Sequence, residues 1–411
     1  MQPGGSMAVA GTRDGRADRG RAGGPAHGRT RPMIVWQPYA AALVTELAHA
    51  GVLAPGWRPP FEQVPRHVFV PEFFTDDDER VSADDAAQHD RWLASVYSDT
   101  SLTTQLMTAP GTDLTWPTSS STRPSLMARM LGLLDVAGGH RVLEIGTGTG
   151  YNVALLSHRL GDTDVTSIDI DPALVETARE RLAGLGYRPR LSAGDGAEGV
   201  VEHAPYDRII ATCGVPEIPL AWITQLTTGG LIVADVRGEL GSSLVVARKS
   251  TPHSVAGRFL TSSGHFMWMR AKADNPLRNG GGFGAVYDFT EPKTGTTNIP
   301  LAAFDDEDFR FALQLAVPGL GAVGHAIRDG GEGIFLVTED DTSWAEISPD
   351  TGNGSTVLYG GPRLLWPDVA DTWHWWNGRG RPERSRFGLT AYDDGRQLIW
   401  LDREDQPIPR H

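Results

Sequence analysis

The chain has 411 residues and a formal net charge of −14, with 37 lysines and arginines against 51 aspartates and glutamates. This length predicts more than one compact core. The acidic balance disfavours nucleic acid and anionic membranes as partners. No stretch approaches the ~20 apolar residues of a membrane span, and the single cysteine, Cys213, cannot form an internal disulfide. We therefore expect a cytoplasmic protein with two domains.

Residues 1–32 are expected to form a disordered tail. Residues 1–31 hold six arginines and two aspartates, a charge of +4, so the rest of the chain carries −18. Glycines and alanines are frequent there, without an apolar period. Met7 and Met33 are alternative start positions, and the tail lacks the apolar stretch of a secretion signal.

A run of hydroxyl side chains lies before the first apolar strand. Residues 118–124 read Thr-Ser-Ser-Ser-Thr-Arg-Pro. Such a run is often only a polar turn, but its place directly before the strand favours an active-site role for Ser120, Ser121 and Thr122. Hydroxyl donors can orient a carboxylate without neutralising it. Arg123 is either a charge partner or a surface residue.

Residues 141–150 combine an apolar strand with alternate glycines, reading Arg-Val-Leu-Glu-Ile-Gly-Thr-Gly-Thr-Gly. The glycines allow a sharp turn and close approach of a ligand, and helical spacing follows from Tyr151. A pyrophosphate fingerprint fits poorly, because the third glycine is Gly150 and Glu144 would repel a phosphate. An acid there suits a cationic group, such as the amino group of a methionyl moiety. Alone, the loop indicates either a cofactor site or an ordinary tight turn.

Two further acids end predicted strands. Strand 165–169 ends in Asp169, about 20 residues after the loop, where an acid can bind both ribose hydroxyls. Strand 190–195 ends in Asp195, and 207–212 predicts a fourth strand. Each acid alone could be a helix cap. Because ligands of a doubly wound sheet bind beyond the carboxyl ends of its strands, Glu144, Asp169 and Asp195 together predict one cofactor crevice.

At these residues the chain resembles the protein-L-isoaspartate O-methyltransferases, which use S-adenosylmethionine. Residues 144–151 are similar to the cofactor loop of the family, and residues 194–196 with 204–210 are similar to its second signature. Residues 64–72 and 97–99 match its amino-terminal part. The resemblance covers roughly residues 60 to 270 and implies a Rossmann-like α/β methyltransferase domain. The cofactor-binding residues that it implies are Glu144, Gly146, Thr147, Gly148, Gly150, Asp169, Ile170, Asp195 and Gly196.

One departure from the family pattern carries functional information. The family has Thr-Ile-Ser-x-Pro before the cofactor strand, with a serine thought to hold the substrate carboxylate, and Thr122 takes that position here. The altered motif and the long carboxy-terminal extension resemble an actinobacterial branch acting on ribosomally made peptides of lanthipeptide, lasso-peptide and graspetide pathways. This implies methylation of a precursor-peptide aspartate, followed by aspartimide and isoaspartate formation. Isoaspartate repair and a catalytically silent peptide escort remain as alternatives.

The rest of the chain predicts a linker and an accessory domain. Residues 33–272 are assigned to the methyltransferase domain with a helical amino-terminal cap, 273–284 to a linker, and 285–411 to an α+β domain for substrate recognition. Strands are expected at 244–247, 264–269, 333–338, 343–347 and 397–401, and a helix at 305–315. Trp366, Val369, Trp373 and Trp376 have the spacing of one packing face of a helix. We expect no metal site, because His265, His325 and His374 lack zinc-ligand spacing. The oligomeric state stays open.

Overall fold

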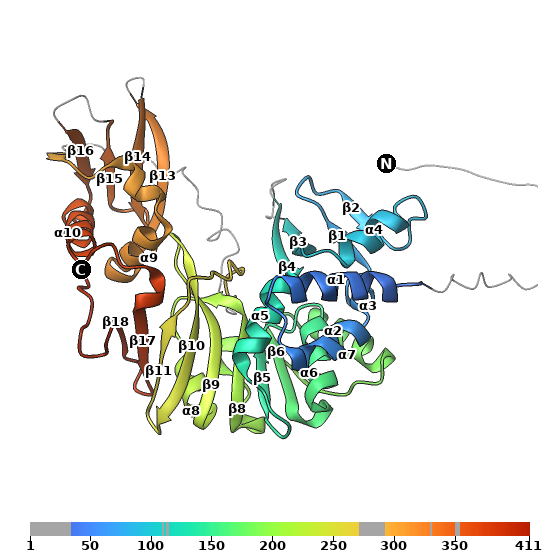
Figure 1. Cartoon of the computed structure of the whole chain (residues 1–411). Coiled ribbons are helices and arrows are strands. Elements are labelled where there is room, and N and C mark those ends of the chain that lie inside the picture. The colour runs from blue at the N-terminus through green and yellow to red at the C-terminus, as the bar shows by residue number, and fades with distance from the viewer. Residues whose placement is uncertain (1–33, 109–110, 112–114, 271–291, 329–330, 350–353) are drawn as a thin grey trace, which may run out of the picture. The chain divides into compact units, whose positions relative to one another are not determined.

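The computed structural model describes residues 34–108, 111, 115–270, 292–328, 331–349 and 354–411, and Trp36–His411 form one compact unit. The expected tail at 1–32, the expected linker at 273–284 and the expected domain start at 285 lie outside the described residues. The described strands form three sheets (Figure 1), which we name the central, amino-terminal and carboxy-terminal sheets.

The central sheet has the strand order β18-β17-β11-β10-β9-β8-β5-β6-β7. Pairing is parallel from β7 to β9 and antiparallel from β9 to β18. Its strands are β5 (Val142–Ile145), β6 (Val165–Asp169), β7 (Arg190–Ala193), β8 (Tyr206–Val215), β9 (Leu226–Arg237), β10 (Ser242–Thr251), β11 (Ser254–Phe259), β17 (Phe387–Tyr392) and β18 (Gln397–Leu401). The parallel strands predicted near residues 142, 165, 190 and 207 are therefore confirmed.

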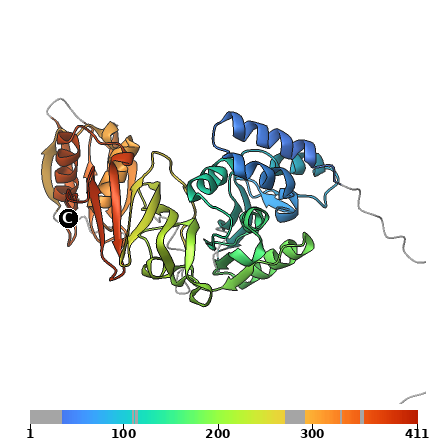
Figure 2. The ribbon, with the colours of Figure 1, turned by 60° about the horizontal axis from the view of Figure 1, so that its bottom comes forward.

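Burial explains the composition of the parallel strands. Every residue of β5 and β6 is buried, as expected for strands covered on both faces. Helices α6 and α7 pack beside β6, and α5 packs on β8 and β9 (Figure 2). The helices of this region are α5 (Pro124–Leu134), α6 (Tyr151–Leu160), α7 (Pro172–Gly184) and α8 (Leu220–Gln225), with short 3₁₀ turns at Asp162–Asp164, Gly196–Glu198 and Val201–His203.

The amino-terminal part contains a sheet in addition to the helical cap that the sequence predicts. Its strand order is β2-β1-β3-β4, with β1 (Glu72–Phe74), β2 (Arg80–Ser82), β3 (Leu102–Thr108) and β4 (Thr115–Ser121). The helices are α1 (Gln37–His49), α2 (Arg58–Gln63), α3 (Arg66–Phe69) and α4 (His89–Val96), with a 3₁₀ turn at Pro55–Trp57. Residues 118–121 of the hydroxyl run thus lie in an edge strand, because β4 pairs with β3, and Thr122 follows the end of that strand.

The carboxy-terminal sheet has the order β12-β16-β15-β14-β13 and carries two helices. The elements are β12 (Lys293–Thr297), β13 (Leu320–Arg328), β14 (Gly331–Thr338), β15 (Trp344–Ile347), β16 (Ser355–Gly360), α9 (Glu307–Ala316) and α10 (Leu365–Gly378), with 3₁₀ turns at Leu301–Asp305 and Arg384–Arg386. The predicted tryptophan face is confirmed: Phe309 lies 5.1 Å from Trp373 and 5.3 Å from Trp376 between ring centroids. The predicted α/β fold with an extra α+β part is likewise present.

One prediction about an individual strand is wrong. Residues 264–269 form no regular strand, and only Trp268 makes an isolated bridge, to Gly214. The strand predicted at 397–401 is confirmed as β18, but it lies at the edge of the central sheet and not in the carboxy-terminal sheet. The rings of Phe259, Phe311 and Phe387 join β11, α9 and β17 in one core. The apolar core is therefore continuous between the cofactor sheet and the carboxy-terminal elements.

Candidate active site

The glycine loop between β5 and α6 has the backbone that the sequence predicts. Gly146, Gly148 and Gly150 have φ angles of 94°, 49° and 89°, in the left-handed region that disfavours other residues. A Cβ atom on Gly146 would lie 2.7 Å from the Thr212 hydroxyl oxygen. The loop can therefore approach β8 closely only because Gly146 has no side chain.

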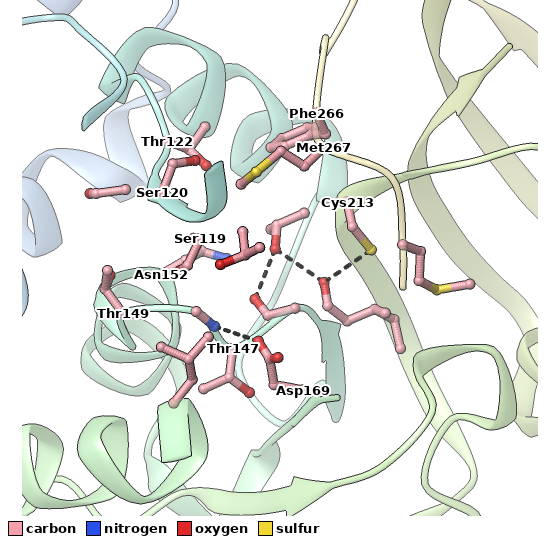
Figure 3. Close-up of a pocket in the computed structure, with 18 of the residues that line it drawn as sticks. Ser119, Ser120, Thr122, Thr147, Thr149, Asn152, Asp169, Cys213, Phe266 and Met267 are labelled. Carbon is pink, nitrogen blue, oxygen red and sulfur yellow. Dashed lines mark hydrogen bonds between the residues drawn. The ribbon is translucent and has the colours of Figure 1, made fainter. Parts of the chain in front are cut away.

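A pocket of about 280 Å³ lies at the carboxyl ends of β5, β6 and β8. Figure 3 shows Ser119, Ser120 and Thr122 on one side of it, and Thr147 and Asp169 on the other. Of the nine expected cofactor residues, those that line the pocket are Glu144, Gly146, Thr147, Gly148, Asp169, Ile170 and Gly196. The structure thus brings most of them together around one cavity.

Gly150 and Asp195 lie outside the pocket lining, and each has a local role. A Cβ atom on Gly150 would lie 3.0 Å from the Ala178 side chain, so this glycine allows α6 and α7 to pack closely. The Asp195 carboxylate accepts a 2.9 Å hydrogen bond from the amide of Ala197 and caps a 3₁₀ turn. The capping interpretation that the sequence left open is therefore the one seen for Asp195.

Glu144 is fully buried at the end of β5. Its oxygens accept hydrogen bonds from Asn152 Nδ2 at 2.7 Å and Ser167 Oγ at 2.6 Å. Because Ser167 has one proton and gives it to Glu144, the Thr147 hydroxyl must donate to Ser167 across their 2.7 Å contact. Burial raises the pKa of Glu144 to about 7, against the opposing effect of these hydrogen bonds.

Asp169 ends β6 and faces the same cavity. Its carboxylate accepts hydrogen bonds from the amides of Gly148, at 2.8 Å, and Asp171, at 3.1 Å. Burial raises the pKa of Asp169, although both amide hydrogen bonds favour the ionised form. Asp169 therefore ties the glycine loop to the next strand while exposing part of its carboxylate to the pocket.

The hydroxyl run on β4 divides into bonded and unbonded side chains. Thr118 donates to Gln105 Oε1 at 2.8 Å, and Ser121 accepts from the Arg66 guanidinium. Within the described residues, no hydrogen bond is made by the hydroxyls of Ser120 or Thr122, and both residues line the pocket. These two hydroxyls are therefore available to a ligand.

Several pocket residues were not predicted from sequence. Ser119 Oγ lies 3.7 Å from where a Cβ atom on Gly148 would be, so Ser119 sits over the glycine loop. Asn152 is only 8% exposed and lines the cavity. Asn152 could have been predicted from the sequence, because it is a polar residue on an otherwise apolar helix face. Residues 264–270 form a further wall, which the prediction of a regular strand concealed.

Backbone hydrogen bonds fix this wall in place. The amide of Gly214 donates to the carbonyl of Met267, and the amide of Met269 donates to the carbonyl of Gly214, both at 2.8 Å. The buried Asp235 carboxylate accepts from the amides of Gly264 and Phe266. Phe266 and Met267 lie beside Thr122 in Figure 3, which gives the hydroxyl end of the pocket an apolar cover.

The cavity fits S-adenosylmethionine in the chemistry of its lining. Asn152 must direct Nδ2 to Glu144, which leaves its Oδ1 as a buried acceptor without a hydrogen bond to any described residue. An orphaned acceptor beside a buried carboxylate calls for a cationic N–H donor. Glu144 and Asn152 would hold the amino group of the methionyl moiety, and Asp169 would hold the ribose hydroxyls.

Two other classes of site have no support in the described part of the chain. No group of three histidine, cysteine, aspartate or glutamate side chains there could hold a metal ion. No helix within the same ranges is long and apolar enough to cross a membrane. Cys213 borders the pocket, and burial raises the pKa of its thiol well above the ordinary value, so it carries no thiolate at neutral pH.

A parallel sheet with this glycine loop and these acids at its strand ends belongs to an S-adenosylmethionine-dependent methyltransferase. The chain belongs to the protein-L-isoaspartate(D-aspartate) O-methyltransferase family, whose model matches residues 39–263. This is the family that the resemblance implied.

Known relatives carry the same name. A protein-L-isoaspartate O-methyltransferase from Christiangramia forsetii is 41% identical over 129 residues, 31% of this chain and 60% of the relative. Protein-L-isoaspartate O-methyltransferase 2 from Geotalea uraniireducens is 33% identical over 213 residues, 50% of this chain and 84% of the relative. The chain therefore spans less than two thirds of the first relative and most of the second.

A solved protein-L-isoaspartate O-methyltransferase resembles more of the chain. It has a TM-score of 0.52 and 22% identity, and the match covers 89% of this chain and all of that one. This likeness shows the fold alone.

Proposed function

We propose that this protein methylates the side-chain carboxylate of an aspartate in a ribosomally made precursor peptide. The pair of unbonded hydroxyls, Ser120 and Thr122, at the pocket end opposite Asp169 supports a carboxylate as the acceptor. Together with Ser119 and Ser121 they form a donor-rich surface for a carboxylate. The replacement of the family's serine by Thr122 supports a precursor peptide as the substrate. A cytoplasmic location is part of the proposal.

The acceptor needs positioning more than proton transfer. An aspartate with a pKa of about 4 is already ionised at neutral pH, so no general base is required. S-adenosylmethionine, when bound, supplies an electrophilic methyl group. Ser120 and Thr122 would donate to one carboxylate oxygen and leave the other free to attack. Phe266 and Met267 would exclude water from that end, which strengthens these hydrogen bonds.

The products follow from the balance of bonds. One carboxylate oxygen gains the methyl group while the sulfur–methyl bond breaks, which gives the aspartyl ester and S-adenosylhomocysteine. In a strained peptide the next backbone amide nitrogen attacks the ester carbonyl and displaces methanol, its proton leaving with the alcohol. The result is an aspartimide, which water can open to isoaspartate. Relative to the starting acid, the ester has gained one CH₂, the aspartimide has lost one water, and the isoaspartate has an unchanged mass.

Isoaspartate repair is the second candidate. The family match favours it, because the family is named for the methylation of isoaspartate. Both candidates place a carboxylate on the same hydroxyls, so the pocket chemistry does not separate them. The peptide backbone around the acceptor distinguishes the two substrates, because an isoaspartyl residue has one more methylene group in the main chain.

Matched peptides separate these functions. The purified chain would be given S-adenosylmethionine with an aspartyl peptide, its isoaspartyl isomer, and a ring-constrained precursor peptide. We expect mass spectrometry to show the methyl ester or dehydrated product mainly on the constrained aspartyl peptide. Turnover of the isoaspartyl isomer alone would replace the proposal with repair. Cofactor binding without transfer to any peptide would favour a silent escort protein.

A further inference from the structure

Arg66 is a buried cation next to the hydroxyl run, and the chemistry above does not use it. It begins α3, is 0% exposed, and lies with its guanidinium 5.8 Å from the ring centre of Tyr151. Burial lowers the pKa of Arg66 to about 10, so the side chain remains charged at neutral pH. A charge in this position requires either a counter-ion or many dipoles.

Carbonyl oxygens supply most of the partners of Arg66. Nη1 donates to Val96 O at 2.8 Å and Ser98 O at 3.2 Å. Nη2 donates to Thr100 O at 3.3 Å, Ser121 O at 3.4 Å and Thr122 O at 3.1 Å. No described carboxylate forms an ion pair with Arg66. The positive charge is therefore held mainly by carbonyl dipoles close to the acceptor end of the pocket, and the Asp99 carboxylate acts on it through space without an ion pair.

The remaining contact fixes the role of one hydroxyl. Ser121 Oγ accepts from Arg66 Nε at 3.3 Å and from Nη2 at 3.2 Å. A hydroxyl oxygen has two lone pairs, and both are used by these bonds. Ser121 lines the pocket, and its hydroxyl donates no hydrogen bond to any described residue. Ser121 can therefore contact a ligand only as a donor.

We propose that Arg66 is a positioning residue that makes Ser121 an obligate donor and gives the acceptor site a positive potential, so that the site selects an ionised carboxylate over a carboxamide. A carboxylate can accept through both oxygens and carries the negative charge that complements Arg66, whereas a carboxamide is neutral and can accept through one oxygen only. The inference rests on the carboxyl acceptor of the proposed function. It does not depend on whether that carboxyl is aspartyl or isoaspartyl.

Binding without turnover tests the selection directly. With S-adenosylhomocysteine present, calorimetry would compare an aspartyl peptide with the asparaginyl peptide of the same sequence, and an isoaspartyl peptide with its amide. We expect wild type to favour the acid by about 10-fold or more, the effect of one charge-assisted hydrogen bond. Ser121→Ala should reduce this ratio to near one while S-adenosylhomocysteine affinity is unchanged.

A double-mutant cycle tests whether Arg66 acts through Ser121. We expect Arg66→Lys to reduce the acid-to-amide ratio and to add little once Ser121→Ala is present. Arg208→Lys is the matched control, because Arg208 is also buried and also donates to carbonyls, those of Leu134, Asp135 and Asp207, away from the pocket. It should leave the ratio at the wild-type value even if it lowers stability.

The outcomes separate this inference from the proposed function. Equal binding of acid and amide peptides by wild type, or an unchanged ratio in Ser121→Ala, overturns the role of the Arg66–Ser121 pair. If the effects of Arg66→Lys and Ser121→Ala on the acid-to-amide ratio are purely additive, Arg66 does not act through Ser121. If Arg66→Lys does not fold, Ser121→Ala alone still tests whether the Ser121 hydroxyl sets this ratio. If only the isoaspartyl peptide is methylated, the proposed function is wrong. The acid-to-amide binding ratio then still tests the role of the Arg66–Ser121 pair.

Discussion

Ser167 on β6 donates a 2.6 Å hydrogen bond to Glu144 on the neighbouring strand β5. The bond joins the two strands at the point where the cofactor loop begins. Burial of Glu144 at this point raises its pKa to about 7, although the hydrogen bond from Ser167 acts in the opposite direction. Both the stability of the protein and its affinity for the cofactor should therefore depend on pH near neutrality.

Stability should fall as pH rises from about 4.5 to 7. The pKa of Glu144 is raised from 4.5 to about 7 in the folded state, so folding takes up a proton in this window. Its contribution is fully present below pH 4.5 and is lost as pH passes 7, an effect of about 3 kcal/mol at most. Urea titrations of wild type and Glu144→Gln across this range should show the fall only in wild type. Parallel curves would contradict the assignment.

Cofactor affinity should change in the opposite direction. The ionised form of Glu144 attracts the ammonium group of S-adenosylmethionine, so the dissociation constant should decrease by up to about 10-fold between pH 6 and pH 7 and level off above that. Calorimetry with S-adenosylmethionine measures it. Glu144→Gln should bind weakly with little pH dependence. A wild-type dissociation constant that is constant from pH 6 to pH 8 would exclude this pairing.

Gly146→Ala should nearly abolish cofactor binding. The new Cβ atom would lie 2.7 Å from the Thr212 hydroxyl oxygen at a φ of 94°, so the loop must move. Gly139→Ala is the control, with a φ of 84° and no heavy atom within 4 Å of the added Cβ. Both variants should lose about 1–2 kcal/mol of unfolding free energy to the unfavourable φ, measured by thermal melts. Only Gly146→Ala should lose S-adenosylmethionine affinity.

The sequence predicted the cofactor half of the site better than the acceptor half. Strand, loop and helix are adjacent in the chain around Glu144, so apolar periodicity and glycines locate them. Ser119 and Met267 meet only through tertiary structure, and residues 264–269 read as a strand because Phe266, Met267 and Met269 are apolar. Strand β18 was misassigned because hydrophobic pattern does not specify which sheet a strand joins. Asp195 shows that an acid at a strand end can serve the backbone instead of a ligand.

Asp169 and Asp195 should respond differently to the same substitution. Asp169→Asn removes a charge from the pocket and weakens the bond that holds the Gly148 amide at 2.8 Å. We expect S-adenosylmethionine affinity to fall by about 10-fold or more. Asp195→Asn retains an acceptor for the amide of Ala197 and should change affinity by less than about 3-fold, since asparagine is also an effective cap. A larger loss in Asp195→Asn would place that side chain on the cofactor after all.

Thr122 should contribute through its hydroxyl and not through its shape. Thr122→Val keeps the volume but removes the donor, so kcat/KM for the methylated peptide should fall by about 10-fold or more. Thr122→Ser retains the hydroxyl and should preserve most of the rate. S-adenosylmethionine affinity, measured alongside, should be the same in all three proteins. If valine and threonine support equal rates, Ser120 alone would have to hold the carboxylate.

The late position of β17 and β18 in the chain has a consequence for synthesis of the protein. These strands, at Phe387–Tyr392 and Gln397–Leu401, complete a sheet whose first strand starts at Val142. While the ribosome is still translating the accessory elements, β11 has an unpaired edge that other chains could join. Pairing across such a sequence separation is also slow to form. Nascent chains should therefore depend on chaperones until residue 401 has emerged, and premature stop codons late in the gene should yield aggregated protein.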